Sequence, residues 1–171
     1  VVWIIKIPKN QETETFRLKY ISAGPVATPE LATNQAFDEI IHFAQISKKG
    51  LEYAKLAVQE NDSNKFEEYR SKLVKYEEIS DRIEYEIAAF LNAVSAADIS
   101  EETSKRIKSM YKIIGELESL GDSGEAISRI LSRRNVHNKT FDQDTIAKLL
   151  KMVANIEKAY DVMIANLNAA H

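Results

Sequence analysis

The sequence contains few of the residues that build loops, cross-links and membrane spans. It has no cysteine, which excludes disulfides, thiol catalysis and zinc–thiolate sites. Its 171 residues include only three prolines and five glycines, which favours long helices. No apolar run approaches the roughly 18 residues of a membrane-spanning helix. The net charge of −3 gives no reason to expect nucleic-acid binding.

The composition that remains is typical of a soluble helical domain. Hydrophobic residues make up 44% of the chain and charged residues 29%. This length suits one domain that is large enough to bury a core. Because the chain begins with Val rather than Met, we expect it to be part of a longer protein.

Helical periodicity and capping residues divide the chain into a connector and a helical domain. Residues 1–27 combine an apolar start, Val-Val-Trp-Ile-Ile-Lys-Ile, with a polar, turn-rich remainder. The apolar start predicts a short strand or packed tail, or else the end of a membrane helix. Thr28-Pro29-Glu30 is a helix start. We expect four long helices, at about 28–60, 64–97, 101–134 and 142–168. Their short links predict an all-α, antiparallel four-helix bundle over residues 28–171.

Three glycines lie inside the predicted third helix, at Gly115, Gly121 and Gly124. Each costs a helix roughly 1 kcal/mol relative to Ala. We therefore expect close approach of another backbone, or of a bound ion, at these positions.

Two stripes of carboxylates share the spacing E-x-x-x-D-x-x-E. The stripe in the third helix is Glu118, Asp122 and Glu125, and that in the second is Glu77, Asp81 and Glu84. This spacing places three side chains within about 60° of one helix face. The stripes lie at similar distances from the predicted turn near residue 99, so we expect them to meet at one level of the bundle. Because like charges repel, something positive should lie against them.

Two kinds of positive partner are consistent with these stripes. One is a metal ion, since carboxylate oxygens bind hard cations. The other is Lys or Arg from the chain itself. Glu39 and His42 also spell the E-x-x-H of di-iron bundles, but that site needs two copies and the sequence has one. We expect His42 to be an ordinary helix-face residue.

The acid stripes resemble those of the PhoU family of phosphate-uptake regulators. Its repeat is a three-helix unit whose second and third helices each carry an E/D-x-x-x-D motif. Leu117-Glu118-Ser119-Leu120-Gly121-Asp122 is similar to the family's L-E-R-I-G-D, with Ser119 where Arg is usual. The resemblance implies one PhoU-like three-helix repeat followed by one further helix.

The N-terminal part of the chain narrows the resemblance. Residues 16–21, Phe-Arg-Leu-Lys-Tyr-Ile, and 27–32, Ala-Thr-Pro-Glu-Leu-Ala, are similar to the linker and first helix that follow the membrane part of bacterial sodium/phosphate cotransporter-family proteins. This implies that residues 1–27 are a connector after a membrane region. Residues 28–171 would then be a domain on the cytoplasmic face of the bacterial inner membrane. Its partner would be the transporter portion of the same polypeptide, and a homodimer stays open.

The resemblance also implies a function. It predicts a non-catalytic regulatory or interaction domain of a sodium-dependent phosphate transporter, with a multinuclear site of iron, manganese, zinc or nickel. The implied ligands are Glu77, Asp81, Glu84, Glu118, Asp122 and Glu125. Two alternatives remain: a carboxylate-bridged metal enzyme of ferritin-like type, and a metal-free structural helical adaptor.

Overall fold

The regular secondary structure of the described part of the protein is all helical, which confirms the predicted all-α class. The computed structural model describes residues 18–21, 28–137 and 139–170. The predictions of an apolar strand, tail or membrane-helix end and of a connector fall mostly on residues 1–17 and 22–27, which lie outside these ranges. The described ranges contain four helices and no strand: α1 (Pro29–Gln59), α2 (Ser63–Ser95), α3 (Glu101–Val136) and α4 (Gln143–Ala169).

Each helix begins where a side chain can accept a hydrogen bond from a free backbone N–H. The Thr28 hydroxyl accepts from Leu31, and Pro29 follows it. The other three caps work in the same way, through Asp62, Ser100 and Asp142. These caps satisfy N–H groups that have no partner within the helix. They explain why the predicted helix starts fall within a residue or two of the observed ones.

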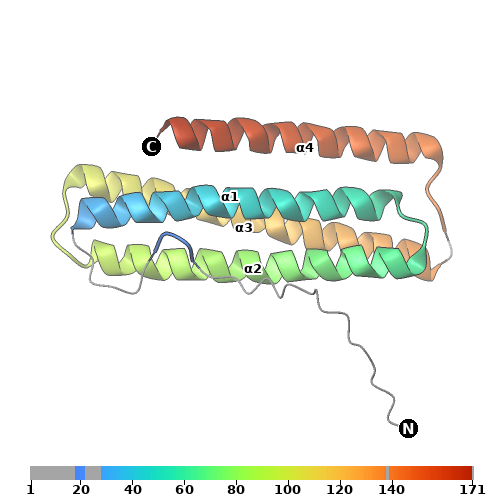
Figure 1. Ribbon diagram of the computed structural model, residues 1–171, viewed down its shortest axis with the longest axis horizontal. Coiled ribbons are helices and arrows are strands. Elements are labelled where there is room, and N and C mark those ends of the chain that lie inside the picture. The colour runs from blue at the N-terminus through green and yellow to red at the C-terminus, as the bar shows by residue number, and fades with distance from the viewer. Residues whose placement is uncertain (1–17, 22–27, 138, 171) are drawn as a thin grey trace, which may run out of the picture.

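Helix α1 is the centre of the molecule. Its backbone lies close to the backbones of the other three helices, whereas the backbone of α4 comes close to that of α1 only (Figure 1). The fold is therefore a three-helix bundle of α1, α2 and α3 with α4 added along the outside of α1. In a closed four-helix bundle, α4 would also pack lengthwise against α3.

Neighbouring helices run in opposite directions where their contacts fix the direction. In the α2–α3 pair, Tyr111 contacts Ala88 and Gly121 faces Ser80, so residue numbers rise in one helix as they fall in the other. Between α1 and α4, Lys48 pairs with Asp161 and Lys55 with Glu157, which gives the same relation.

The buried core forms two apolar clusters at different levels of the bundle. The larger is centred on Ile40, Phe43, Ile83, Ile87 and Ile114. The smaller contains Ala57, Phe66, Leu73 and Leu131. Between them lies a cavity of about 70 Å³, whose lining includes Ser47, Gly50, Ser80, Gly121 and Gly124. The core is thus interrupted by small residues at the level where Glu77 also reaches the cavity wall.

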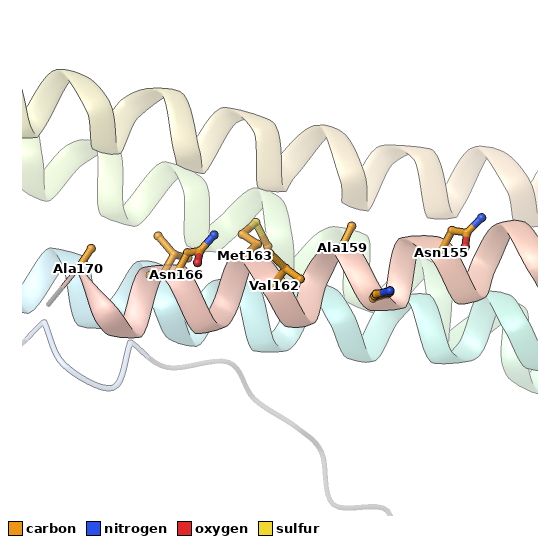
Figure 2. A pocket seen from close by; sticks show the side chains of 8 residues that line it. Asn155, Ala159, Val162, Met163, Asn166 and Ala170 are labelled. Atoms are coloured by element: carbon orange, nitrogen blue, oxygen red, sulfur yellow. The ribbon is translucent and has the colours of Figure 1, made fainter.

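One side of α4 is left open to solvent. Met152 is 61% exposed and Val162 is 52% exposed. A shallow groove follows this side of the helix and is lined by α4 residues that include Ala159, Val162 and Met163 (Figure 2). Separately, none of the helices in the described ranges is both long and apolar enough to cross a membrane.

Candidate metal centre

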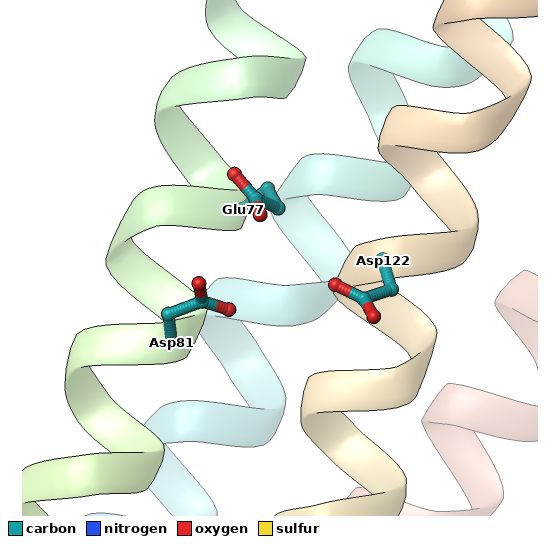
Figure 3. A group of neighbouring side chains, drawn as sticks. All are labelled: Glu77, Asp81 and Asp122. Carbon is teal, nitrogen blue, oxygen red and sulfur yellow. The ribbon is translucent and has the colours of Figure 1, made fainter.

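The α2–α3 pair brings members of the two acid stripes together, as their spacing predicts. Glu77 and Asp81 lie on α2 and Asp122 lies on α3. One carboxylate oxygen from each lies within 4.8 Å of the other two (Figure 3). Figure 3 shows the three side chains turned toward one another across the gap between the helices.

The three acids form a site at the surface. Glu77 is half-buried, and its side chain also lines the cavity between the two core clusters. Asp81 and Asp122 are exposed. The cluster is therefore supported from below by the bundle and open to solvent above.

The cluster's own negative charge disfavours ionisation of Glu77. Burial raises the pKa of Glu77, and the nearby charges of Asp81, Asp122 and Glu125 raise it further. This is the expected response of a carboxylate that has lost water and gained like-charged neighbours.

Glu118, on α3, is a second carboxylate whose ionisation the neighbouring acids disfavour. Burial raises the pKa of Glu118, and the charges of Asp122, Glu84 and Asp81 add to that effect. A weak hydrogen bond from the Ser119 hydroxyl to Glu118, at 3.4 Å, acts in the opposite direction. Charges of the other predicted ligands thus act on Glu77 and on Glu118, and three of the six acids present oxygens within a single 4.8 Å group.

The chain supplies little positive charge to these acids. Glu125 pairs with Arg129 one helical turn away, at 2.9 Å. Throughout the described ranges, none of the other five predicted ligands has a Lys or Arg within ion-pair distance. The metal-free alternative requires that these acids pair with Lys or Arg of the chain. Among the six predicted ligands, the described ranges show such a pair at Glu125 only.

The donor set fits an oxygen-ligated cation. Two oxygens on opposite sides of one ion lie about 4–5 Å apart when each metal–oxygen distance is about 2.0–2.5 Å. The 4.8 Å limit for Glu77, Asp81 and Asp122 agrees with that span. The three remaining acids are linked to this group by charge, since Glu125 acts on Glu77, and Glu84, Asp81 and Asp122 act on Glu118. A centre with more than one ion would have to recruit them.

The predicted close approach of a second helix is found at Gly121 and not at Gly115. A Cβ on Gly121 would lie 3.1 Å from the Ser80 Oγ and 3.2 Å from its Cβ, so a side chain there would crowd α2. At Gly124 the contact with Leu73, at 3.7 Å, is of ordinary van der Waals length. At Gly115 a Cβ would meet nothing within 4 Å, so no close approach explains that glycine.

The Glu39–His42 motif has a different role from that of a metal ligand pair. His42 Nδ1 lies 2.8 Å from Glu39 Oε1, while Glu39 Oε2 accepts the backbone N–H groups of Lys19 and Tyr20 at 2.7 Å each. Burial opposes the charge on Glu39, yet these hydrogen bonds together lower its pKa below the ordinary value. Glu39 thus holds residues 18–21 against α1. The helix-face interpretation of His42 missed this clamp.

Arg134 is a second residue whose role the sequence does not reveal. Its position near the end of α3 suggests an interaction with the negative end of its own helix. Instead the buried guanidinium donates to the carbonyls of Val58 and Glu60, at the end of α1. It also lies over the rings of Phe66 and Phe141.

No known protein family, curated protein or solved structure matches this chain. The resemblance to the PhoU family therefore rests on the motif residues of the sequence.

Proposed function

We propose that this chain is a non-catalytic regulatory or interaction domain of PhoU type that holds a metal centre between α2 and α3. It would belong to a sodium-dependent phosphate transporter at the cytoplasmic face of a bacterial inner membrane. The transporter portion would precede the connector and would be its first partner. These assignments come from the resemblance of residues 16–21, 27–32 and 117–122.

One observation carries the metal assignment. Three carboxylate oxygens converge within 4.8 Å, and none of the three acids has a Lys or Arg partner in the described ranges. An arrangement of like charges with no internal counterion costs free energy in the folded state. A bound cation would remove that cost.

The residues would divide the work by position. Glu77, Asp81 and Asp122 would hold the first ion, because their oxygens already converge. Glu84 and Glu118 would bind a second ion farther along the α2–α3 surface. Glu125 would give up its ion pair with Arg129 to bind metal. The metal would supply positive charge that attracts the carboxylates of both helices. Iron, manganese, zinc and nickel are the candidate metals.

Regulation would follow from the two helices that share the site. Without a cation the acids on α2 and α3 repel each other, and with one they are drawn together. A ligand shifts a conformational equilibrium only by its difference in affinity for the two states. Metal binding would therefore bias the α2–α3 packing, and the connector clamped at Glu39 would link the domain to the transporter.

The described ranges give the ferritin-like alternative little support. Such centres use Glu-x-x-His pairs that point into a bundle core. Here the two members of the single Glu39–His42 pair bond to each other and to residues 19 and 20. Elemental analysis decides whether the domain is instead a metal-free adaptor.

Elemental analysis tests the proposal. We expect the purified chain, after reconstitution with iron, manganese, zinc or nickel, to retain stoichiometric metal. An Asp81→Asn/Asp122→Asn variant should lose it. A Glu102→Gln/Glu116→Gln variant removes the same charge from exposed positions of α3 outside the cluster, and it should retain the metal. Absence of metal from the wild-type chain with all four ions would favour the metal-free adaptor.

A further inference from the structure

The open side of α4 carries a regular series of uncharged residues. The series is Met152, Ile156, Ala159, Met163, Asn166 and Ala170. Successive members are four, three, four, three and four residues apart, which is the spacing of the a and d positions of a coiled coil. We call these six residues the α4 seam. The last four of them line the shallow groove on this helix, and Figure 2 shows those four along one side of it.

The seam is exposed although most of it is apolar. Met152 is 61% exposed and Ile156 is 37% exposed, and the two alanines and the asparagine are exposed as well. Met163 is half-buried, because it packs against the larger core cluster. The side of α4 that faces α1 is different, since Val153 and Tyr160 are buried there. Helix α4 thus has two apolar sides, and within the described ranges α1 covers one of them.

The charged residues of this part of α4 lie outside the seam. Three charged residues occur along the length of helix that the seam spans: Glu157, Lys158 and Asp161. Glu157 and Asp161 form ion pairs with lysines of α1. Lys158 lines the groove but is not a seam position. Because the seam itself is uncharged, it offers no ion pair to a charged ligand such as nucleic acid. It suits an apolar helix face.

Helix α3 adds apolar surface beside the seam. The side chains of Ile156 and Leu120 both line the cavity between the two core clusters, so α3 and α4 are neighbours at this level. Leu120 is 40% exposed. Ile127, one turn and a half farther along α3, is half-buried and lines the same cavity. The surface that a partner could cover therefore includes part of α3.

The size of this surface is near the lower limit for a specific dimer. From Met152 to Ala170 the seam extends 18 residues along α4, or about 27 Å. Two adjacent helices, each about 10 Å wide, present roughly 500 Å² over that length. Two copies would then bury about 1,000 Å² in total, which is at the small end of specific interfaces. We therefore expect a dimer that dissociates on dilution.

The seam is complementary to a reversed copy of itself. In an antiparallel pair, with a twofold axis at the middle of the seam, each residue faces a different residue of the second copy. The facing pairs would be Met152 with Ala170, Ile156 with Asn166, and Ala159 with Met163. Each pair joins a large side chain to a smaller one, which allows the two helices to interdigitate. In a parallel pair, Met would face Met and Ala would face Ala.

We propose that the α4 seam is the interface of a homodimer in which two copies pack antiparallel about a twofold axis. The large side chains of each seam fill the space beside the small ones of the other, and Leu120 borders the contact. The dimer is closed, because both copies use the same surface. No seam residue is among the predicted metal ligands, so the inference does not depend on the proposed function.

Sedimentation velocity tests the dimer. We expect monomer at about 1 μM and dimer at about 500 μM, with no weakening at high salt because the seam is uncharged. Ala159→Glu places a charge inside the seam and should raise the dissociation constant at least about tenfold. Ala165→Glu adds the same charge at another exposed position of α4, outside the seam, and should leave the constant unchanged. Circular dichroism establishes that both variants are folded.

Disulfide cross-linking tests the orientation, and the chain has no cysteine of its own to interfere. A disulfide needs two Cα atoms within about 7 Å. Copies with Met152→Cys, mixed with copies that carry Ala170→Cys, should cross-link under mild oxidation. In the antiparallel dimer two Met152→Cys copies hold their thiols about 27 Å apart, so this variant alone should not cross-link.

Three outcomes would overturn the inference. One is a monomer at every concentration. Another is an equal dissociation constant for Ala159→Glu and Ala165→Glu, which would place the contact elsewhere. The third is cross-linking of Met152→Cys with itself, which would show a parallel pair. All of these variants leave the carboxylates of α2 and α3 in place, so the dimer and the metal analysis can fail separately.

Discussion

Glu77 and Glu118 are carboxylates whose surroundings favour the protonated form. Their folded-state pKa lies above the usual 4.5, whereas in the unfolded chain it returns to that value. The folded state therefore binds more protons between these two values. By linkage, the free energy of unfolding contributed by these groups falls as pH rises through that interval.

This sign gives a pH prediction for the metal-free protein. We expect urea unfolding to show a decrease in stability as pH rises from about 4.5 toward neutrality. A Glu77→Gln/Glu118→Gln variant, which cannot ionise at these sites, should show a smaller decrease. Glu39 has a lowered pKa and acts below 4.5, so it does not obscure this interval. Identical pH profiles for the variant and wild type would contradict the electrostatic account.

Single residues also show where sequence reasoning stops. The meeting of the two acid stripes could be predicted because the spacing within each stripe is local. Both stripes also lie at similar distances along the chain from the turn that joins α2 and α3. The roles of Glu39 and Arg134 could not, because their partners are backbone groups 19 to 76 positions away. A backbone N–H or carbonyl has no signature in the sequence. Only the fold brings it to a particular side chain.

At the scale of elements, caps and glycines affect the helices differently. The caps are chemically specific, so the helix starts could be predicted closely. The glycines are ambiguous, because a helix can place a glycine where another helix packs closely or where a side chain would meet open space. Gly121 is of the first kind and Gly115 of the second.

This difference predicts opposite responses to the same substitution. Gly115→Ala adds a methyl group to open space and should raise the free energy of unfolding by about 0.5–1 kcal/mol through helix propensity. Gly121→Ala places its methyl group 3.1 Å from the Ser80 Oγ, so it should gain less or lose stability. Denaturant titration of both variants gives the comparison. A larger gain at Gly121 would contradict the observed packing.

For the whole molecule, the main difference from expectation is the position of α4. The apolar periodicity of this helix predicted a buried face, and Val153 and Tyr160 are indeed buried. Periodicity does not say which helix will cover that face. The structure places the backbone of α4 close to that of α1 only, and the other side of α4 stays open.

We therefore expect α4 to be the least stable helix. Hydrogen exchange should be faster in α4 than in the middle of α2 or α3, since fewer elements protect it. Tyr160→Phe should accelerate it further, because the buried Ser47 hydroxyl loses a partner at 2.6 Å, at a cost of about 1–3 kcal/mol. A Ser47→Ala/Tyr160→Phe variant should recover part of this loss. Protection of α4 equal to that of α2 would contradict the prediction.

The Glu39 clamp has a mechanical consequence. Residues 18–21 are fastened to the interior of α1 by two hydrogen bonds to one carboxylate, and by Leu18 and Ile21 packed on the larger core cluster. A pulling force applied to the chain before residue 18 would act on α1 at Glu39 and not at the first turn of the helix. Because α1 touches all three other helices, that force would spread through the bundle instead of peeling one helix from its end.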